Sequence, residues 1–160
     1  MARQLETCPE YERCRRLVVY AALPDELPLA VVIERAAGAG KHLLWPRLIG
    51  EERMAFGSVD RVESLVEGRY GVPEPPASSP AEMLGPDVLV LAPGVAFDAC
   101  GGRLGRGRGL WDRALADARG AVIFGVGYEL QVIDRVPHEI HDRPIDALLT
   151  EAAIRRFGRA

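Results

Sequence analysis

Short runs of apolar residues, in which apolar and polar positions do not alternate, dominate the hydrophobic pattern of the chain. Such runs are typical of strands that are buried on both faces of a parallel sheet. The strongest example is residues 87–93, which end at a proline. We assign strands to residues 17–22, 42–46, 87–93 and 121–125, with 54–56 and 62–66 as weaker candidates.

Helical segments are expected between these strands. Residues 30–37 form a largely apolar segment that stops near Gly38 and Gly40, as helices commonly do. Residues 109–119 are a second helix candidate, and residues 146–156 are interpreted as a further helix or turn. Strands that alternate with helices predict an α/β fold, in which helices are layered on one sheet.

The segment 71–80 contains four prolines and is interpreted as a loop. Proline lacks a backbone donor and fixes φ, so neither a helix nor a sheet is expected to continue through this segment. We interpret it as a connection within a domain, because neither flanking half is large enough to fold alone. The expectation is a single domain, residues 1–160, which is an ordinary size for one hydrophobic core.

Composition and charge exclude several classes of protein. With 48% hydrophobic and 27% charged residues, the chain resembles globular domains rather than disordered segments. Its net charge of −3 gives no general reason to expect a nucleic-acid partner. No apolar run approaches the ~20 residues that span a bilayer, and residues 1–6 do not resemble a signal peptide. We therefore expect no membrane association and a cytoplasmic location, with the three unevenly spaced cysteines as reduced thiols.

Glycines and arginines alternate in residues 101–109, which follow the strongest strand candidate. Glycine lets the backbone adopt positive φ and approach a ligand, so successive N–H groups can surround phosphate oxygens. The start of the following helix candidate adds a partial positive charge. Arg103, Arg106 and Arg108 can donate paired hydrogen bonds to the same oxygens. The pattern indicates a phosphate-binding loop.

Other interpretations of this Gly/Arg loop stay open on the residues alone. The Gly-Lys-Ser/Thr of a Walker A motif is absent, and the glycine spacing is not that of a dinucleotide-binding fingerprint. A flexible, arginine-rich surface loop or an RNA-contact loop has a similar composition. The pI near 5.7 and the aromatic content of 6% disfavour RNA, because stacking on bases needs exposed rings.

Two aspartates are candidate magnesium ligands. Asp112 ends the glycine- and arginine-rich segment, and Asp142 lies in residues 137–144 together with two histidines. Mg²⁺ prefers one or two carboxylates together with water and nucleotide phosphates. The structural alternatives are a helix-start aspartate for Asp112 and an Asx-type turn for Asp142. A zinc site needs a third ligand that the sequence does not nominate.

Several separated motifs, in one order, resemble the 5-formyltetrahydrofolate cyclo-ligase family. The resemblance covers nearly the whole chain, so it is far more specific than any one motif. It rests on Asp25-Glu26, Gly40-Lys41, residues 44–47, 54–56 and 71–75, Pro93 to Asp98, Gly102 to Gly109 with Asp112, Gly125, Glu129, Gln131, Val136-Pro137, His141-Asp142 and Leu149 to Glu151.

The resemblance implies a three-layer αβα domain with a Rossmann-like, mainly parallel sheet and a cleft beyond the carboxyl ends of its strands. It also implies an enzyme that uses ATP and Mg²⁺ to convert 5-formyltetrahydrofolate to 5,10-methenyltetrahydrofolate. ATP would phosphorylate the formyl oxygen, N10 of the folate would attack the activated carbon, and phosphate would leave. The implied partners are ATP and the reduced folate, and we expect a monomer or a weak dimer.

The resemblance also implies roles for residues of this chain. Arg106 and Arg108 would be catalytic, and Asp112 and Asp142 would hold Mg²⁺ between phosphate oxygens. Glu26 would pair with pterin donors, and a solvated loop acid is its structural alternative. The nucleotide would contact Arg103, Leu104, Gly105, Arg106, Gly107, Arg108, Gly109, Leu110 and Trp111. The folate would contact Ala21, Glu26, Arg106, Gly107, Arg108, Gly109 and Leu110.

The N-terminal part of the chain departs from the family. Family members usually begin with a helix whose Lys and Arg side chains reach the phosphates, whereas Arg3 is the only basic residue before Cys8 here. Each lost charge-assisted contact to phosphate removes roughly 1.5–3 kcal/mol. Arg13, Arg15 and Arg16 are expected either to replace part of that charge or to form a solvated helix face.

Further departures concern side chains beside the ligands. Leu110 and Trp111 replace a pair of tyrosines, and Leu29 replaces a threonine. Trp111 keeps an aromatic face but offers an indole donor in place of a phenol. Two hypotheses follow: an active cyclo-ligase, and a weak or inactive family member that binds nucleotide or folate.

Overall fold

A seven-stranded sheet forms the centre of the molecule in the computed structural model, which describes residues 1–59, 61–139 and 142–158. The five inner strands are parallel to one another, and each edge strand is antiparallel to the strand beside it. The mainly parallel sheet expected from the sequence is therefore confirmed. Across the sheet the strands are β11 (Ile154–Arg156), β10 (Ala147–Leu149), β9 (Val122–Val126), β6 (Val88–Pro93), β1 (Arg16–Val18), β2 (His42–Ile49) and β3 (Arg53–Ser58).

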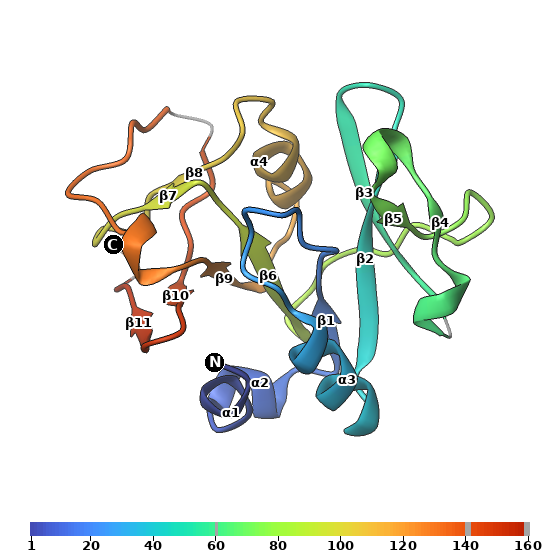
Figure 1. Ribbon diagram of the computed structural model, residues 1–160, viewed down its shortest axis with the longest axis horizontal. Coiled ribbons are helices and arrows are strands. Elements are labelled where there is room, and N and C mark those ends of the chain that lie inside the picture. Colours follow the sequence, from blue (N-terminus) through green and yellow to red (C-terminus); the bar gives the residue numbers. More distant parts are fainter. Residues whose placement is uncertain (60, 140–141, 159–160) are drawn as a thin grey trace.

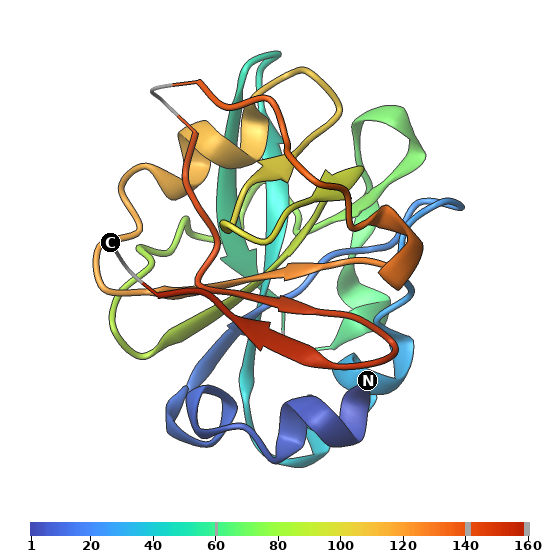
Figure 2. The same ribbon diagram turned by 90° about the vertical axis from the view of Figure 1, so that its left-hand side faces the viewer.

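Helices cover both faces of this sheet (Figures 1 and 2). Three of them, α1 (Ala2–Glu6), α2 (Pro9–Arg13) and α3 (Ala30–Gly38), lie on one face, and α4 (Leu110–Leu115) lies on the other. The molecule thus has the expected three-layer αβα architecture. In the described part of the chain, no helix has the length and apolar character needed to cross a membrane.

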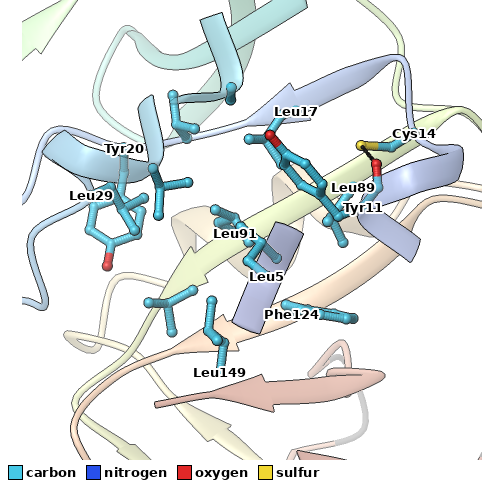
Figure 3. Close-up of a cluster of buried hydrophobic side chains, with 14 of the residues drawn as sticks. Leu5, Tyr11, Cys14, Leu17, Tyr20, Leu29, Leu89, Leu91, Phe124 and Leu149 are labelled. Atoms are coloured by element: carbon cyan, nitrogen blue, oxygen red, sulfur yellow. Dashed lines mark hydrogen bonds between the residues drawn. The ribbon is translucent and has the colours of Figure 1, made fainter. Parts of the chain in front are cut away.

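The central strand β6 joins two hydrophobic clusters. All of its residues are buried, because β1 and β9 pair with its two edges and a cluster covers each face. Leu89 belongs to the cluster beneath α1, α2 and α3, and Val90 belongs to the cluster beneath α4. Figure 3 shows the first cluster, in which Leu5 and Tyr11 of the N-terminal helices pack with Leu89 and Phe124 of the sheet.

Shorter elements lie in the connections. Two small antiparallel pairs stand apart from the main sheet, and both lie beside the cleft described below. These elements are η1 (Val62–Ser64), β4 (Val66–Glu67), η2 (Arg69–Gly71), β5 (Pro73–Glu74), β7 (Ala96–Phe97), β8 (Arg103–Leu104) and η3 (Glu129–Gln131). β5 lies within 71–80, so the expectation that this segment contains no sheet is wrong for two residues.

The segment 146–156 is a strand hairpin, so the expectation of a helix or turn there is wrong. β10 pairs in parallel with β9, and β11 returns antiparallel beside β10. All three residues of β10 are buried. An apolar run of three residues is too short for periodicity to separate strand from helix. The segment becomes a strand because it pairs with the edge of β9 that β6 leaves free.

Other predicted elements are present with different boundaries. β1 ends at Val18 rather than at residue 22, although Val19 and Tyr20 are also buried. α4 ends at Leu115 rather than at residue 119. The weak strand candidate at 62–66 is mostly the turn η1, with only its last residue in β4.

Candidate functional site

A cleft with a volume of about 380 Å³ opens beyond the carboxyl ends of β1 and β6. This is the end of a parallel sheet at which α/β proteins bind their ligands, because the connections diverge there. The walls of the cleft are connections, the terminal parts of strands and the first turn of α4. The lining residues come from the segments 20–26, 46–54, 69–74, 93–95 and 103–112.

The Gly/Arg loop adopts backbone conformations that require glycine. Gly107 has φ of 81° and Gly109 has φ of 57°, both in the left-handed region where a side chain is strained. Gly109 directly precedes α4 and places the first turn of that helix beside the cleft. The loop thus has the positive φ values that the sequence analysis expected of its glycines.

Arg106 of the loop reaches across the cleft to two acids. Its guanidinium pairs with the carboxylate of Asp25, and its Nε lies 3.7 Å from Oε1 of Glu26. Arg106 is exposed, so its side chain can exchange these acids for other anions at low cost. The structure therefore brings a predicted phosphate-binding residue next to the predicted folate-binding residue.

The loop that carries Glu26 is held in place by hydrogen bonds at both ends. Tyr20 donates to the carbonyl oxygen of Leu27 at 2.8 Å, and the N–H of Leu23 donates to Oε2 of Glu26 at 2.9 Å. Burial raises the pKa of Tyr20, so the phenol remains a neutral donor. The side chain of Glu26 is 13% exposed, far less than the 67% of Asp25. Glu26 is thus a positioned acid of the cleft wall rather than a fully solvated one.

Arg108 points toward the opposite rim of the cleft. Its guanidinium donates to the hydroxyl of Tyr70 and lies 5.2 Å from the centre of that ring. Tyr70 is 63% exposed and has φ of 66°, which is unusual for a residue with a side chain. Strained backbone of this kind concentrates at functional sites.

Arg103 differs from the other two arginines because its side chain is buried. Its Nη2 donates to Oδ1 of Asp112 at 2.6 Å, and its Nη1 donates to the carbonyl oxygen of Pro93 at 3.3 Å. The side chain of Arg103 is 1% exposed, whereas that of Arg106 is 47% exposed. The predicted phosphate ligand Arg103 is therefore paired with the predicted metal ligand Asp112.

The remaining predicted contact residues line the cleft or lie at its rim. The ring of Trp111 packs against Phe56, with 5.8 Å between ring centres. Ala21 and Leu110 are partly exposed in the cleft wall, and Leu104 points to the surface from β8. Trp111, at the second position of the replaced tyrosine pair, thus joins the cleft to the core.

Asp142 lies outside the cleft wall formed by the described residues. Its Oδ2 accepts a hydrogen bond from the backbone N–H of Glu139 at 2.7 Å, and Nδ1 of His138 lies 3.7 Å from the same oxygen. This hydrogen bond links Asp142 back to a residue before it, and so differs from the Asx-type turn of the sequence analysis, in which the aspartate accepts from a residue after it. His141 falls outside the described residues. Ile145, three residues after Asp142, packs in the same cluster as Leu115 of α4, so this connection and the Asp112 helix share one face of the sheet.

Potential metal ligands are sparse elsewhere. Across residues 1–59, 61–139 and 142–158 there is no group of three or more His, Cys, Asp or Glu side chains that fits a metal ion. An ion held mainly by the protein is therefore not supported there. One carboxylate in a cleft with room for phosphates fits Mg²⁺, which keeps several waters and binds nucleotide oxygens.

Tyr70 and Glu74 are among the cleft residues to which the sequence analysis gave no ligand. Both lie around the prolines of 71–80, a segment interpreted as a connection, although residues 71–75 contributed to the family resemblance. Glu74 is 8% exposed, and its Oε2 accepts a hydrogen bond from the N–H of Leu48 at 3.2 Å. Burial raises the pKa of Glu74. An isolated acid beside prolines and a neighbouring aromatic residue were the available signals.

Two of the departures from the family lie away from the cleft. Arg16 begins β1, at the opposite end of that strand from the cleft, and bonds Asp87 through Nε and Nη2 at 2.8 Å each. The hypothesis that Arg16 replaces missing phosphate-binding charge is therefore wrong. Leu29 is buried in the cluster beneath α3, so its replacement of threonine alters packing rather than the cleft lining.

Comparisons with known proteins point to one family. A model of the 5-formyltetrahydrofolate cyclo-ligase family matches residues 1–151. A probable 5-formyltetrahydrofolate cyclo-ligase of Schizosaccharomyces pombe is 30% identical, with 98% of this chain and 84% of that protein covered. A 5-formyltetrahydrofolate cyclo-ligase of Escherichia coli K12 is also 30% identical, with 96% and 87% covered. The solved structure of Aquifex aeolicus 5,10-methenyltetrahydrofolate synthetase matches with a TM-score of 0.80 and 31% identity, over 99% of this chain and 81% of that one.

Proposed function

The chain belongs to the 5-formyltetrahydrofolate cyclo-ligase family, and from this premise we propose that it converts 5-formyltetrahydrofolate to 5,10-methenyltetrahydrofolate with ATP and Mg²⁺. The observation that carries the proposal is the contact of Arg106 with Glu26 inside the cleft. Ring closure requires a phosphate-binding group and a pterin-binding group side by side, because the phosphoryl group moves between the two substrates. The pair of Arg106 and Glu26 supplies both groups.

The proposed reaction joins N10 to the formyl carbon and is driven by conversion of ATP to ADP and phosphate. The formyl oxygen attacks the γ-phosphorus of ATP, and ADP leaves. The lone pair of N10 then attacks the formyl carbon, N10 loses its proton, and the C–O bond breaks with release of inorganic phosphate. Such reactions depend mainly on positioning and on stabilising negative charge.

Arg106 and Arg108 are proposed to stabilise that charge. Each already bonds an oxygen-bearing partner at the rim of the cleft, Asp25 for Arg106 and Tyr70 for Arg108. Both arginines are exposed, so exchanging these partners for phosphate oxygens costs little desolvation. The backbone N–H groups of the loop, with positive φ at Gly107 and Gly109, are proposed to bind the triphosphate along its length.

Glu26 is proposed to orient the folate. Its Oε2 is fixed by the N–H of Leu23, and Oε1, which lies 3.7 Å from Nε of Arg106, is proposed to accept from donors of the pterin. Ala21 and Leu110 offer apolar contact to the rest of the folate, close to the loop that contacts the nucleotide. Discrimination among folates is expected to depend on Glu26, because a buried acceptor without a donor is costly.

Bound Mg²⁺ neutralises phosphate charge and fixes the direction of the transferring group. Asp112 is proposed as its ligand in the cleft, with Asp142 as the second carboxylate. For Asp142 the proposal requires release of the hydrogen bond from the N–H of Glu139. We also propose that the protein is cytoplasmic. We propose in addition that it is a monomer or a weak dimer, and gel filtration tests the oligomeric state.

The decisive experiment incubates the purified chain with 5-formyltetrahydrofolate, ATP and Mg²⁺ and follows both released phosphate and the methenyl product. We expect phosphate release that depends on the folate and equals product formation. Arg106→Gln should abolish most of it, whereas Arg119→Gln, a change at an exposed arginine outside the cleft, should leave it unchanged. Tight binding of both ligands without turnover would instead identify a binding protein of the family.

A further inference from the structure

We propose that Arg103 is a positioning residue for Asp112 rather than a direct ligand of the triphosphate. The inference rests on the proposed function, because it concerns how the cleft presents its carboxylate to a metal-bound nucleotide. In this arrangement Arg103 fixes Oδ1 of Asp112, and Oδ2 would be available to a metal ion. The guanidinium itself makes no contact with phosphate.

The first support is the contrast in burial among the three arginines of the loop. The side chain of Arg103 is 1% exposed and lies beneath the loop, whereas Arg106 and Arg108 extend into solvent at the rim. Arg103 belongs to β8, which pairs with β7 in register, and this pairing aims its side chain inward. Arg103 lines the cleft, but protein neighbours cover its guanidinium almost completely, whereas a phosphate ligand has to present its donors to the nucleotide.

The second support is the set of partners that Arg103 already has. Nη2 bonds Oδ1 of Asp112 at 2.6 Å, and Nη1 bonds the carbonyl oxygen of Pro93 at the end of β6. These two bonds connect the central strand to the first turn of α4. Breaking either bond would leave a buried charge or polar group without its partner, which is costly, so the guanidinium is held in place.

The third support is the packing around the side chain. A Cβ atom at Gly94 would lie 3.1 Å from Cγ of Arg103, and one at Gly105 would lie 3.4 Å from Nη1. The backbone therefore approaches Arg103 closely at Gly94 and lies in contact with it at Gly105. Nε of Arg103 is buried and has no hydrogen-bond partner among the described residues. The guanidinium is thus held through its bonds to Asp112 and Pro93, while Nε stays unpaired.

The consequence for Asp112 is a carboxylate with one oxygen held and one oxygen available. Among the described residues, Arg103 is the partner that bonds the carboxylate of Asp112, whose side chain is 17% exposed at the cleft. Mg²⁺ demands near-ideal octahedral geometry, so a carboxylate held in one rotamer binds it better than a mobile one. Loss of Arg103 should thus reduce metal affinity before it reduces nucleotide affinity.

The test measures binding and needs no turnover. The proteins are the wild type, Arg103→Gln, Asp112→Asn, the double variant, and Arg119→Gln as a matched surface control. Calorimetry gives the affinity for ATP in the presence of a chelator, and electron paramagnetic resonance gives the affinity of Mn²⁺ for each protein–ATP complex. We expect Arg103→Gln to bind metal-free ATP as the wild type does and to lose about tenfold or more in Mn²⁺ affinity.

The double variant distinguishes positioning from independent action. If Arg103 acts through Asp112, the double variant binds Mn²⁺ no more weakly than Asp112→Asn alone. Additive losses overturn the inference, and so does an Arg103→Gln protein whose metal-free ATP affinity drops about tenfold with Mn²⁺ affinity unchanged. A wild type that binds neither ATP nor Mn²⁺–ATP overturns both the proposed function and this inference. A wild type that binds both, with additive losses in the variants, overturns this inference alone.

A measurement on the wild type covers the case in which Arg103→Gln does not fold. Arginine side-chain resonances are recorded by NMR while metal-free ATP and then Mg²⁺ are added. We expect ATP to shift the resonances of Arg106 and Arg108, and Mg²⁺ to shift that of Arg103. A shift of Arg103 on addition of metal-free ATP, equal to that of Arg106, contradicts the inference.

Discussion

Nε of Arg106 lies 3.7 Å from Oε1 of Glu26, and the two side chains meet inside one cleft from separate connections of the sheet. Arg106 also pairs with Asp25, the exposed neighbour of Glu26. The arginine proposed to bind phosphate is therefore adjacent to the acid proposed to bind folate. This arrangement predicts that the two acids differ sharply in their effect on activity.

Glu26→Gln should raise the KM for 5-formyltetrahydrofolate by about tenfold to a hundredfold, because a charge-assisted hydrogen bond to the pterin is lost. The KM for ATP should change far less. Asp25→Asn is the matched control, since Asp25 is largely exposed and its pair with Arg106 is worth little. Steady-state kinetics of both variants check this. Equal effects of the two changes on the folate KM would contradict the assigned role of Glu26.

Trp111→Ala should destabilise the protein by about 2 kcal/mol, because the ring contact with Phe56 and part of the core packing are lost. Trp111→Phe keeps an aromatic ring and should cost about half as much. Urea unfolding of the three proteins measures the difference. If both changes cost the same, the contribution of Trp111 comes from its indole N–H rather than from packing.

Stability should fall in acid through the pair of Glu10 and Arg156. Hydrogen bonds from Arg156 lower the pKa of Glu10 from 4.5 to about 2. A carboxyl with a lowered pKa stabilises the fold fully above 4.5, and this contribution disappears as the pH falls through about 2. Glu10→Gln lacks the contribution, so its deficit in free energy of unfolding should shrink over that interval. A deficit that stays constant with pH would show that the charge of Glu10 does not stabilise the fold.

Glu74 predicts a pH dependence of the opposite sign. Burial raises its pKa, so the charged form destabilises the fold once the pH exceeds the ordinary value of 4.5. Glu74→Gln keeps an acceptor for the N–H of Leu48 and carries no charge. Relative to the wild type, the variant should gain stability between acidic and neutral pH. Urea midpoints at both pH values measure it, and a relative loss at neutral pH contradicts the prediction.

The sheet could be predicted from the sequence wherever burial and apolar character coincide. β6 is apolar throughout and is buried on both faces, so its pattern identifies it directly. β10 was mistaken for part of a helix or turn because three apolar residues have no resolvable period. Its identity depends on pairing with β9, which is a contact between distant segments.

The sequence was enough to predict which segments form the candidate site, but not which of their residues contact one another. The Gly/Arg loop and Glu26 were identified from the sequence, and the structure brings them together. The burial of Arg103 could not be read from the alternation of glycine and arginine, because it depends on which residues of β8 face inward. Tyr70 was missed because prolines in its neighbourhood indicate a connection, and a connection can also form a wall of a cleft.

The segments that line the cleft are mostly connections and strand ends, together with the first turn of α4, whereas the two hydrophobic clusters lie within the layers. Recognition and folding are thus encoded by largely separate stretches of the chain. A library that randomises the links while holding the strands constant should yield folded variants with altered ligand preference. Tyr20, Met54 and Trp111 are among the exceptions, since each lines the cleft and also packs in a hydrophobic cluster, and such a library should leave them untouched.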